Sequence, residues 1–336
     1  DIVTLDRVRK ISIQADTDVW LEYAGEKGIH GAILSYLSLK KENFYMVENT
    51  VDGKFFVTAR GWEDLSEILK SYEELQVEIG EELIGEFLQK EEIARDFAGY
   101  YRLYEKYKSD YQIQEILDGN VISGQLKTCC DMGKKASFEE RFTVTEMLLE
   151  AVTERISVFQ KIDEKTEKLY ENLKLLKIFL QEKNSVEAME QFVASRRKAL
   201  DAKICSELLT AEEAAREEEQ IRILEEYFFQ LKELHISDVA EGIEQIGERF
   251  GNVCRLRNEK LEETKKMLEQ AFSFLEECFG EGQEWLLFET GLTGDDRCSI
   301  FISQYGCPSY FKHCELLLYS KKENELRKEC RDLLEE

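Results

Sequence analysis

Residues 55–72, FFVTARGWEDLSEILKSY, predict the end of a strand, then a helix cap and then an amphipathic helix. Thr58 has the short hydroxyl side chain that caps helix N-termini. Apolar side chains then recur every three or four residues, as in a helix with one face in a core. They are Trp62, Leu65, Ile68, Leu69 and Tyr72. The stretch therefore predicts a helix that begins just after Thr58.

Arg60 lies in the first turn of this predicted helix. The helix dipole makes that end positive, so a cation there is unfavourable unless an anion lies nearby. First-turn amides together with a guanidinium form a good phosphate site. The plainer alternative is chance, with the charge screened by solvent. Arg60 is therefore a candidate phosphate-binding residue, and its position alone leaves both explanations open.

The composition favours helices along the whole chain. Its 336 residues include a single proline, Pro308, and many Glu, Lys and Leu residues. Helix interiors exclude proline, whereas loops and turns use it freely. We therefore expect a mainly α fold, long enough for two or three domains.

The charge balance indicates which partners to expect. The chain carries 45 basic and 70 acidic residues, a formal net charge of −25. Such a chain repels nucleic acid and anionic membranes, so we expect neither as a partner. There are nine cysteines in no repeating spacing, and we find no N-terminal signal segment and no long uncharged apolar run. These features favour reduced thiols and a cytoplasmic location.

The first part of the chain divides into two segments. Residues 1–16 contain VRKISIQA, which alternates like a strand that has nothing to pair with, and the chain begins with Asp1. Both suggest the end of a domain from a longer protein. Residues 17–120 predict a helix capped by Asp16 or Thr17, a second helix over 29–41 and a hairpin at Asp52-Gly53. The helix after Thr58 and two further helices, over 81–89 and 91–117, complete this segment, and GNVISG at 119–124 marks a boundary.

Residues 121–336 predict long helices. Apolar residues from Phe142 to Leu180 follow a helical repeat, either as one helix of some forty residues or as two that meet near Asp163. Further helices are expected over 185–200, after the T-x-x-E capping box of Thr210 and Glu213, and over 261–278. These patterns fit long antiparallel helices packed like a coiled coil or bundle, with a compact C-terminal cap. In that cap Gly306 ends one helix and Ser309 starts the last.

Searches for catalytic motifs find none. The sequence has no phosphate-binding loop, no dinucleotide fingerprint, no H-E-x-x-H and no nucleophile elbow. Cys307, His313 and Cys314 are too irregularly spaced for a typical zinc site. The vicinal pair Cys129-Cys130 lacks C-x-x-C spacing. We therefore expect no metal site and treat these cysteines as core residues.

Asp6 and Arg7 form the other notable feature, in the sequence LDRV ahead of the predicted strand. They fit a solvated surface turn. They also fit an arginine finger, in which Arg7 reaches the nucleotide phosphate of a neighbouring subunit.

Several motifs in order resemble the end of a MoxR-type AAA+ ATPase. They are TLDRVRKISI (4–13), a helix with WLEYA (20–24), a hairpin, and VTARGWEDLSEIL (57–69). In that family the ATPase core closes with an LDRF-like turn. A helical lid follows, whose last helices open with Ser/Thr-Pro-Arg and an aromatic residue. The resemblance covers roughly residues 1–120, and residues 292–317 resemble the C-terminal tail of some members.

The resemblance assigns roles to both arginines. Arg60 matches the sensor-2 arginine, which reaches from the lid to the γ-phosphate of ATP, and Thr58 matches its cap. Arg7 matches the arginine finger, acting in trans on the next subunit. Ala59 stands where the family has proline, and Val8 stands where it has phenylalanine.

The implied function is that of one part of a larger machine. The phosphate loop and the magnesium-binding acid are missing, so this chain would be the C-terminal piece of the ATPase and inactive alone. ATP and Mg²⁺ would be cofactors of the whole protein, with none bound to this chain. The parent would couple ATP hydrolysis to remodelling a partner protein or to cofactor insertion. Expected partners are its own ATPase core, neighbouring subunits and a protein substrate or adaptor. The alternative is a stand-alone acidic helical scaffold for protein–protein interaction, and a cysteine-based metal or redox protein is least favoured.

Overall fold

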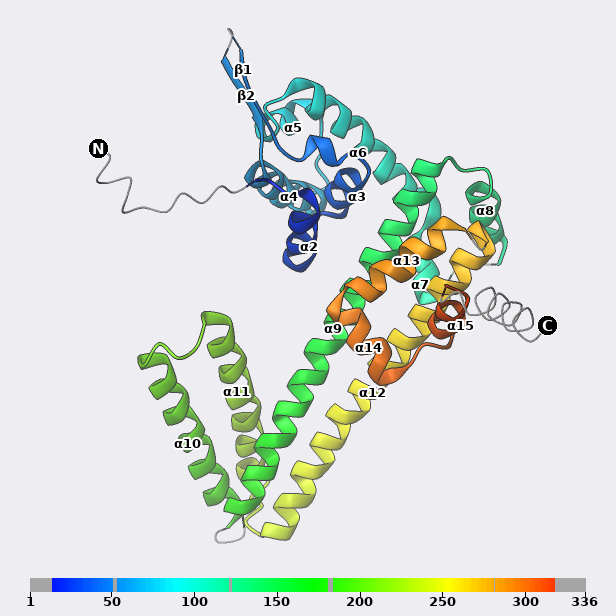
Figure 1. Ribbon diagram of the computed structural model, residues 1–336. Coiled ribbons are helices and arrows are strands. Elements are labelled where there is room, and N and C mark those ends of the chain that lie inside the picture. Colours follow the sequence, from blue (N-terminus) through cyan, green and yellow to red (C-terminus); the bar gives the residue numbers. More distant parts are fainter. Residues whose placement is uncertain (1–13, 51–52, 121–122, 181–183, 281, 318–336) are drawn as a thin grey trace, which may run out of the picture. The chain divides into compact units, whose positions relative to one another are not determined.

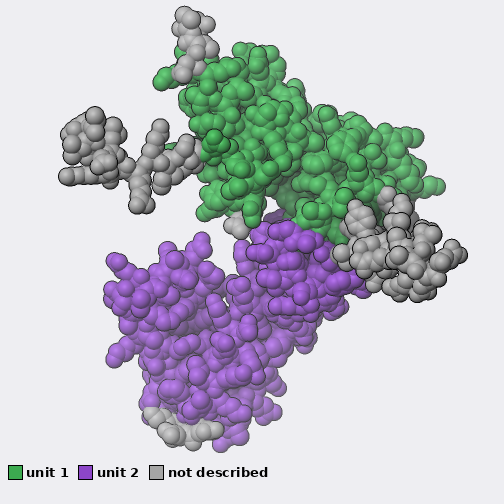
Figure 2. Space-filling view, viewed as in Figure 1, with its two compact units in different colours: residues 1–152, 270–292 green, residues 153–269, 293–336 purple. Residues whose placement is uncertain are grey.

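The computed structural model describes residues 14–50, 53–120, 123–180, 184–280 and 282–317 (Figure 1). These residues are mainly helical and contain one two-stranded antiparallel sheet, which confirms the predicted fold class at that level. They form two compact units (Figure 2). Unit 1 falls within residues 1–152 and 270–292, and unit 2 within residues 153–269 and 293–336.

Unit 1 begins with a series of short elements. In chain order they are α2 (Thr17–Lys27), α3 (Gly31–Leu39), a 3-10 turn (Lys41–Asn43), β1 (Met46–Thr50), β2 (Gly53–Val57), α4 (Ala59–Glu74), α5 (Glu81–Phe87), α6 (Glu91–Tyr111), α7 (Ile113–Asp118) and α8 (Ser123–Gly133). Asp16 caps α2, because its carboxylate accepts hydrogen bonds from the amides of Asp18 and Val19. Gly28, with φ 67°, ends this helix in the left-handed conformation that glycine adopts readily.

β1 and β2 pair as the predicted hairpin, but with a shifted turn. The register pairs Met46 with Val57 and Thr50 with Gly53. Gly53 is therefore the first residue of β2 and not the second residue of the turn. Residues 51 and 52, which include half of the predicted turn, lie outside the described residues.

The helix predicted over residues 91–117 is in fact two helices. α6 ends at Tyr111, and Gln112 has φ 50°, a left-handed conformation that breaks the hydrogen-bond ladder before α7. The break is hidden in the sequence because apolar residues continue across it. Tyr111 and Ile113 on either side are both buried.

A cluster of aromatic side chains forms the core of the first part of unit 1. Tyr36, Trp62 and Phe97 are fully buried, and their ring centroids lie 5.2–5.8 Å apart. The indole Nε1 of Trp62 donates a hydrogen bond to the carbonyl of Phe44 at 3.1 Å. The predicted apolar face of α4 is thus confirmed at Trp62, where the helix contacts α3 and α6.

Two distant segments complete unit 1. They are the first part of α9 (Phe138–Phe179) and the residues from 270 onward, which comprise the end of α12 (Val239–Phe279) and most of α13 (Gln283–Gly294). Phe274 of α12 is 2% exposed, and its ring packs edge-on to Tyr111. The two units therefore divide within α9 and α12. Gly119 ends α7 in the left-handed conformation, whereas the long-range packing of residues 270–292 defines the unit.

Unit 2 contains the rest of α9 and α12, with α10 (Ser185–Cys205), α11 (Ala211–Glu233), α14 (Asp296–Tyr305) and α15 (Pro308–Leu317). α9 is one helix of 42 residues, so the alternative of two helices meeting near Asp163 is wrong. Thr210 and Glu213 form the predicted capping box at the start of α11. Gly306 ends α14 as predicted, and the last helix begins one residue before Ser309.

Apolar side chains from α9, α10, α11 and α12 share one core in unit 2. Phe192 of α10 and Leu224 of α11 are among its most deeply buried members. α10 and α11 lie side by side along this core (Figure 1). Burial of one stripe on each helix is what the 3-4 spacing of their apolar residues requires.

Candidate functional site

The N-terminus of α4 is formed as the sequence predicts. Thr58 has extended backbone angles, and its Oγ1 accepts a hydrogen bond from the amide of Gly61 at 3.3 Å. Its carbonyl accepts the first helical bond, from Trp62 at 3.2 Å. Thr58 thus joins the end of β2 to α4 and fixes the direction in which the first turn of the helix faces.

Close packing restricts the first turn of α4. A Cβ atom added at Gly61 would lie 2.9 Å from the carbonyl oxygen of Phe87, at the end of α5. The backbone of α4 can approach α5 this closely only because residue 61 has no side chain. The first turn is therefore held between its own cap and the last carbonyl of α5.

The side chain of Arg60 projects from this turn into solvent. It is 88% exposed, and its Nε lies 3.6 Å from Oδ2 of Asp64, one turn further along α4. Asp64 is itself 55% exposed, so this ion pair is weak. The guanidinium thus serves no packing role in unit 1, and it lies beside amides at the positive end of a helix dipole.

Arg7, the second arginine expected to contact phosphate, lies outside the described residues. The structure therefore brings together Thr58 and Arg60 through the cap and leaves the position of Arg7 untested. His313 and the cysteine after it have side chains outside the described residues as well.

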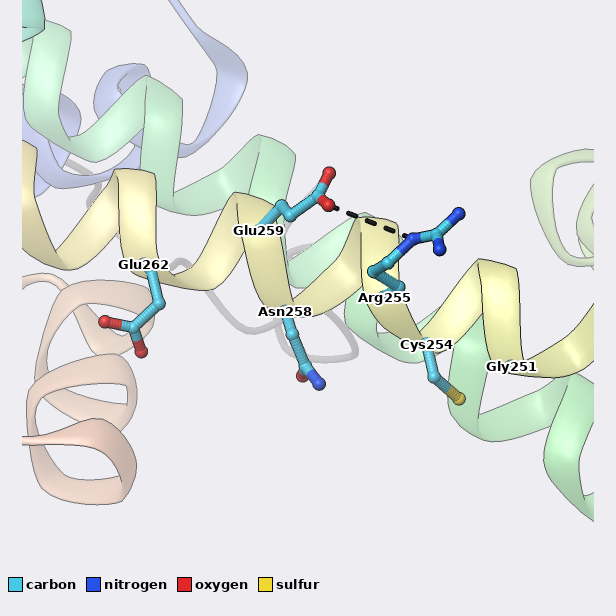
Figure 3. A pocket seen from close by; sticks show the side chains of 6 residues that line it. All are labelled: Gly251, Cys254, Arg255, Asn258, Glu259 and Glu262. Carbon is cyan, nitrogen blue, oxygen red and sulfur yellow. Dashed lines mark ion pairs between the residues drawn. The ribbon is translucent and has the colours of Figure 1, made fainter.

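An open hollow of about 500 Å³ lies along α12 in unit 2 (Figure 3). It is lined by Gly251, Cys254, Arg255, Asn258, Glu259 and Glu262. All six residues belong to a single helix, and Arg255 pairs with Glu259 at 4.0 Å. Ligand sites usually combine convergent polar groups from several elements. One helix face does not supply them, so this hollow is a weak candidate.

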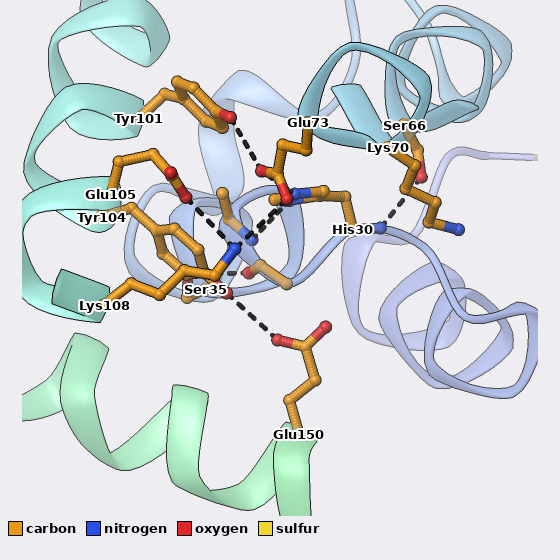
Figure 4. Close-up of polar contacts among 12 residues, drawn as sticks. His30, Ser35, Ser66, Lys70, Glu73, Tyr101, Tyr104, Glu105, Lys108 and Glu150 are labelled. Carbon is orange, nitrogen blue, oxygen red and sulfur yellow. Dashed lines mark hydrogen bonds and ion pairs between the residues drawn. The ribbon is translucent and has the colours of Figure 1, made fainter. Parts of the chain in front are cut away.

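A polar network surrounds Glu73 at the opposite end of α4 (Figure 4). The Nδ1 of His30 accepts a hydrogen bond from the amide of Ala32, so its Nε2 carries the proton donated to Glu73 Oε1 at 2.8 Å. The hydroxyl of Tyr101 donates to the same oxygen at 2.8 Å. Lys108 donates to Oε2 at 3.2 Å. The network thus joins α3, α4 and α6.

These contacts keep Glu73 ionised. Burial acts to raise the pKa of Glu73, but the hydrogen bonds from His30 and Tyr101, the electrostatic attraction of the His30 ring and the charge of Lys108 outweigh it. The pKa is lowered to about 2. A carboxylate held by three donors is a poor proton acceptor for catalysis, so we interpret Glu73 as a structural anchor.

Two acids one turn apart on α9 form another unexpected group in unit 1. Burial, together with the charge of Glu150, raises the pKa of Glu146 to about 7. Glu150 accepts a hydrogen bond from the Tyr104 hydroxyl at 3.1 Å and lies against Gly31, the first residue of α3. A Cβ added at Gly31 would come within 1.7 Å of its Oε2. The carboxylate therefore occupies the positive end of α3.

Sequence reasoning missed Glu73, Glu146 and Glu150 because nothing distinguishes them among 70 acidic residues. For Glu146, the neighbouring residues in the sequence provide a signal. The flanking residues of α9 are apolar and buried, namely Val144, Met147, Leu148 and Ala151. An acid within such a run is a candidate for a shifted pKa.

Within residues 14–317, gaps excepted, no cluster of three or more His, Cys, Asp or Glu side chains could hold a metal ion. Cys307 instead donates to Glu269 at 3.2 Å. In the same ranges no helix combines the length and the apolar character needed to cross a bilayer.

Comparison with known proteins returns no relative. No protein-family model, no curated protein and no solved structure matches this chain. Function is therefore inferred from the geometry at the start of α4 and from the order of the sequence motifs.

Proposed function

We propose that residues 17–120 are the lid of a MoxR-type AAA+ ATPase and that Arg60 is its sensor-2 arginine. The observation that carries the proposal is the exposure of Arg60, 88%, on the first turn of a helix capped by Thr58. Thr58 is assigned to the same nucleotide-binding region because it sets the direction of that turn.

The energetics of this position favour an anionic ligand. A cation at a helix N-terminus costs roughly 0.3–1 kcal/mol. The exposed partner Asp64, at 3.6 Å, offsets little of this cost. A phosphate oxygen at this end of α4 would be stabilised by the dipole and could accept from the guanidinium. ATP provides such a group at the boundary between a lid and its nucleotide core.

The remaining parts of the proposal follow from the resemblance. Arg7 acts as an arginine finger on the nucleotide of the neighbouring subunit. ATP and Mg²⁺ belong to the whole protein, whose core supplies the phosphate loop that this chain lacks. The ATPase works in the cytoplasm, where it remodels a partner protein or assists cofactor insertion.

In this proposal unit 2 is the coiled-coil-like extension that contacts the partner protein. Apolar side chains on its helices and in the loop between α10 and α11 face solvent, which supports a docking role. They include Leu208 at 72%, Ile178 at 63% and Phe229 at 57% exposure. The net charge of −25 argues against nucleic acid or an anionic membrane as that partner.

The test is the rate of ATP hydrolysis by the whole protein that carries this chain. Arg60→Ala should lower kcat by about 100-fold, the usual effect of removing one donor to a developing phosphate charge. Arg255→Ala is the matched control, since Arg255 is also exposed, at 68%, and also pairs with an acid one turn later, but lies in mid-helix. Its kcat should be unchanged. Unaltered turnover in a folded Arg60→Ala protein would refute the sensor assignment.

The second candidate is a stand-alone acidic scaffold that binds a protein and no nucleotide. The exposed apolar residues of unit 2 favour it equally. The intact mass of the native protein separates the two proposals. A mass near 39.3 kDa supports the scaffold, and a mass larger by one or two domains supports the ATPase.

A further inference from the structure

Two buried thiols of unit 1 lie unusually close to each other. Cys130 is on α8 and Cys278 is near the end of α12, 148 positions later in the chain. Their sulfur atoms are 2.6 Å apart, and the residues are 6% and 0% exposed. A disulfide bond measures about 2.05 Å, so a small side-chain movement would bring the two sulfurs to bonding distance.

The packing of the two helices accounts for this proximity. Gly133 lies almost one turn after Cys130 on α8. A Cβ atom added there would lie 3.5 Å from Cβ of Cys278 and 2.9 Å from the ring of Phe279. The absence of a side chain at Gly133 lets α8 approach α12, and this approach places Cys130 opposite Cys278.

Cys129, the neighbour of Cys130 in sequence, faces another element. Its sulfur lies 3.6 Å from the carbonyl oxygen of Asp110 and 3.9 Å from that of Tyr111, at the end of α6. Two adjacent residues of a helix point in different directions, so only one of them can face α12. The structure therefore selects Cys130 as the partner of Cys278.

We propose that Cys130 and Cys278 are the site of an intramolecular disulfide that forms when the protein meets a peroxide. The sulfur of Cys130 attacks one peroxide oxygen, the O–O bond breaks, and one water molecule leaves with the thiol proton. The resulting sulfenic acid is attacked by Cys278, the S–S bond forms, and the second water leaves. Two thiols lose two electrons, and the peroxide gains them.

The expected rate follows from the environment of the thiols. Burial raises the pKa of Cys130, although the contact with Cys278 partly counteracts it, and burial raises the pKa of Cys278 much further. Cys130 therefore ionises first and is the sulfur that meets peroxide. Because the thiolate is the nucleophile, oxidation is slow at neutral pH and accelerates about tenfold per pH unit below the pKa.

To test this proposal, the whole chain is treated with hydrogen peroxide and the remaining thiols are then blocked. The chain is digested with trypsin, and the peptides are analysed by mass spectrometry without reductant. The expected product joins peptide 128–134 to peptide 267–297 and separates when dithiothreitol is added. Peptide 128–134 contains both Cys129 and Cys130, so single variants must distinguish them. Cys129→Ser is the matched control and should form the same link at the same rate.

The variants give opposite expectations. Cys130→Ser and Cys278→Ser should each abolish the link, with circular dichroism to show that the chain is folded. A link that persists in Cys130→Ser overturns the pairing. Wild-type and Cys129→Ser chains that keep both thiols after peroxide, at neutral and at alkaline pH, overturn the site itself. This second result does not depend on the folding of either core variant.

Discussion

Glu73 shows how much a single carboxylate can contribute to the stability of unit 1. It is the common acceptor for His30, the N-cap residue of α3, and for side chains of α6, and its own side chain is 25% exposed. Its pKa of about 2 lies below the ordinary value of 4.5 because the folded protein favours the charged form. The stability that it contributes is therefore fully present above pH 4.5 and is lost as the pH falls towards 2.

Glu73→Gln should lower the stability of unit 1 by about 2 kcal/mol at pH 7 and by little at pH 2. Glutamine still accepts hydrogen bonds from His30 and Tyr101 but gives Lys108 no charge partner. Urea unfolding across this pH range measures the difference. Glu74→Gln, at the exposed neighbouring position, should leave the curve unchanged. A constant loss at every pH for Glu73→Gln would mean that the charge of Glu73 is not the source of the stability.

For individual residues, the sequence predicts helix caps better than it predicts contacts between side chains. The cap of Thr58 depends on neighbours within three residues, so it could be predicted and is confirmed. The contacts of Glu73 involve residues up to 43 positions away, so they depend on the fold. Arg60 lies between these cases, since its place on α4 was predictable and its ligand is a proposal.

Elements with strong periodicity and a cap are predicted well from this sequence. α9 and the start of α11 follow from the 3-4 repeat and from the T-x-x-E motif. α8 was not predicted, because Leu126, Cys129 and Cys130 follow a helical spacing over too short a run to indicate a helix. The break between α6 and α7 was missed because glutamine is not a typical residue at positive φ.

Gln112→Gly should stabilise unit 1 by about 0.5–1 kcal/mol. Gln112 has φ 50°, where a Cβ atom is strained and glycine is not. Gln112→Ala retains the Cβ and serves as the control, with no gain expected. The urea midpoints of the three proteins give the answer. A loss of stability in Gln112→Gly would show that the glutamine side chain outweighs the strain of its backbone.

At the scale of the whole molecule, unit 1 is discontinuous in sequence. Phe274 belongs to it through contact with Tyr111, although residues 153–269, which belong to unit 2, lie between them in the chain. No local sequence pattern could reveal this arrangement. A glycine indicates a turn from its immediate neighbours in sequence, whereas two residues that pack together can be far apart in sequence.

Phe274→Ala should destabilise unit 1 by about 3–4 kcal/mol, the usual cost of removing a buried ring. Amide hydrogen exchange should rise in α6 and α7 and stay unchanged around Phe192, in the core of unit 2. Phe192→Ala should give the reverse pattern. Equal loss of protection in both units from either variant would contradict the division into two units.

Because unit 1 is discontinuous in sequence, it cannot fold completely until late in the synthesis of the chain on the ribosome. Residues 153–269 must all be translated before Phe274 emerges, a delay on the order of ten seconds at typical rates. Until then the nascent chain has Tyr111 and the buried face of α8 without their native cover. General chaperones bind exposed apolar surface of this kind, so ribosome-associated ones should engage this chain between the synthesis of α8 and that of α13.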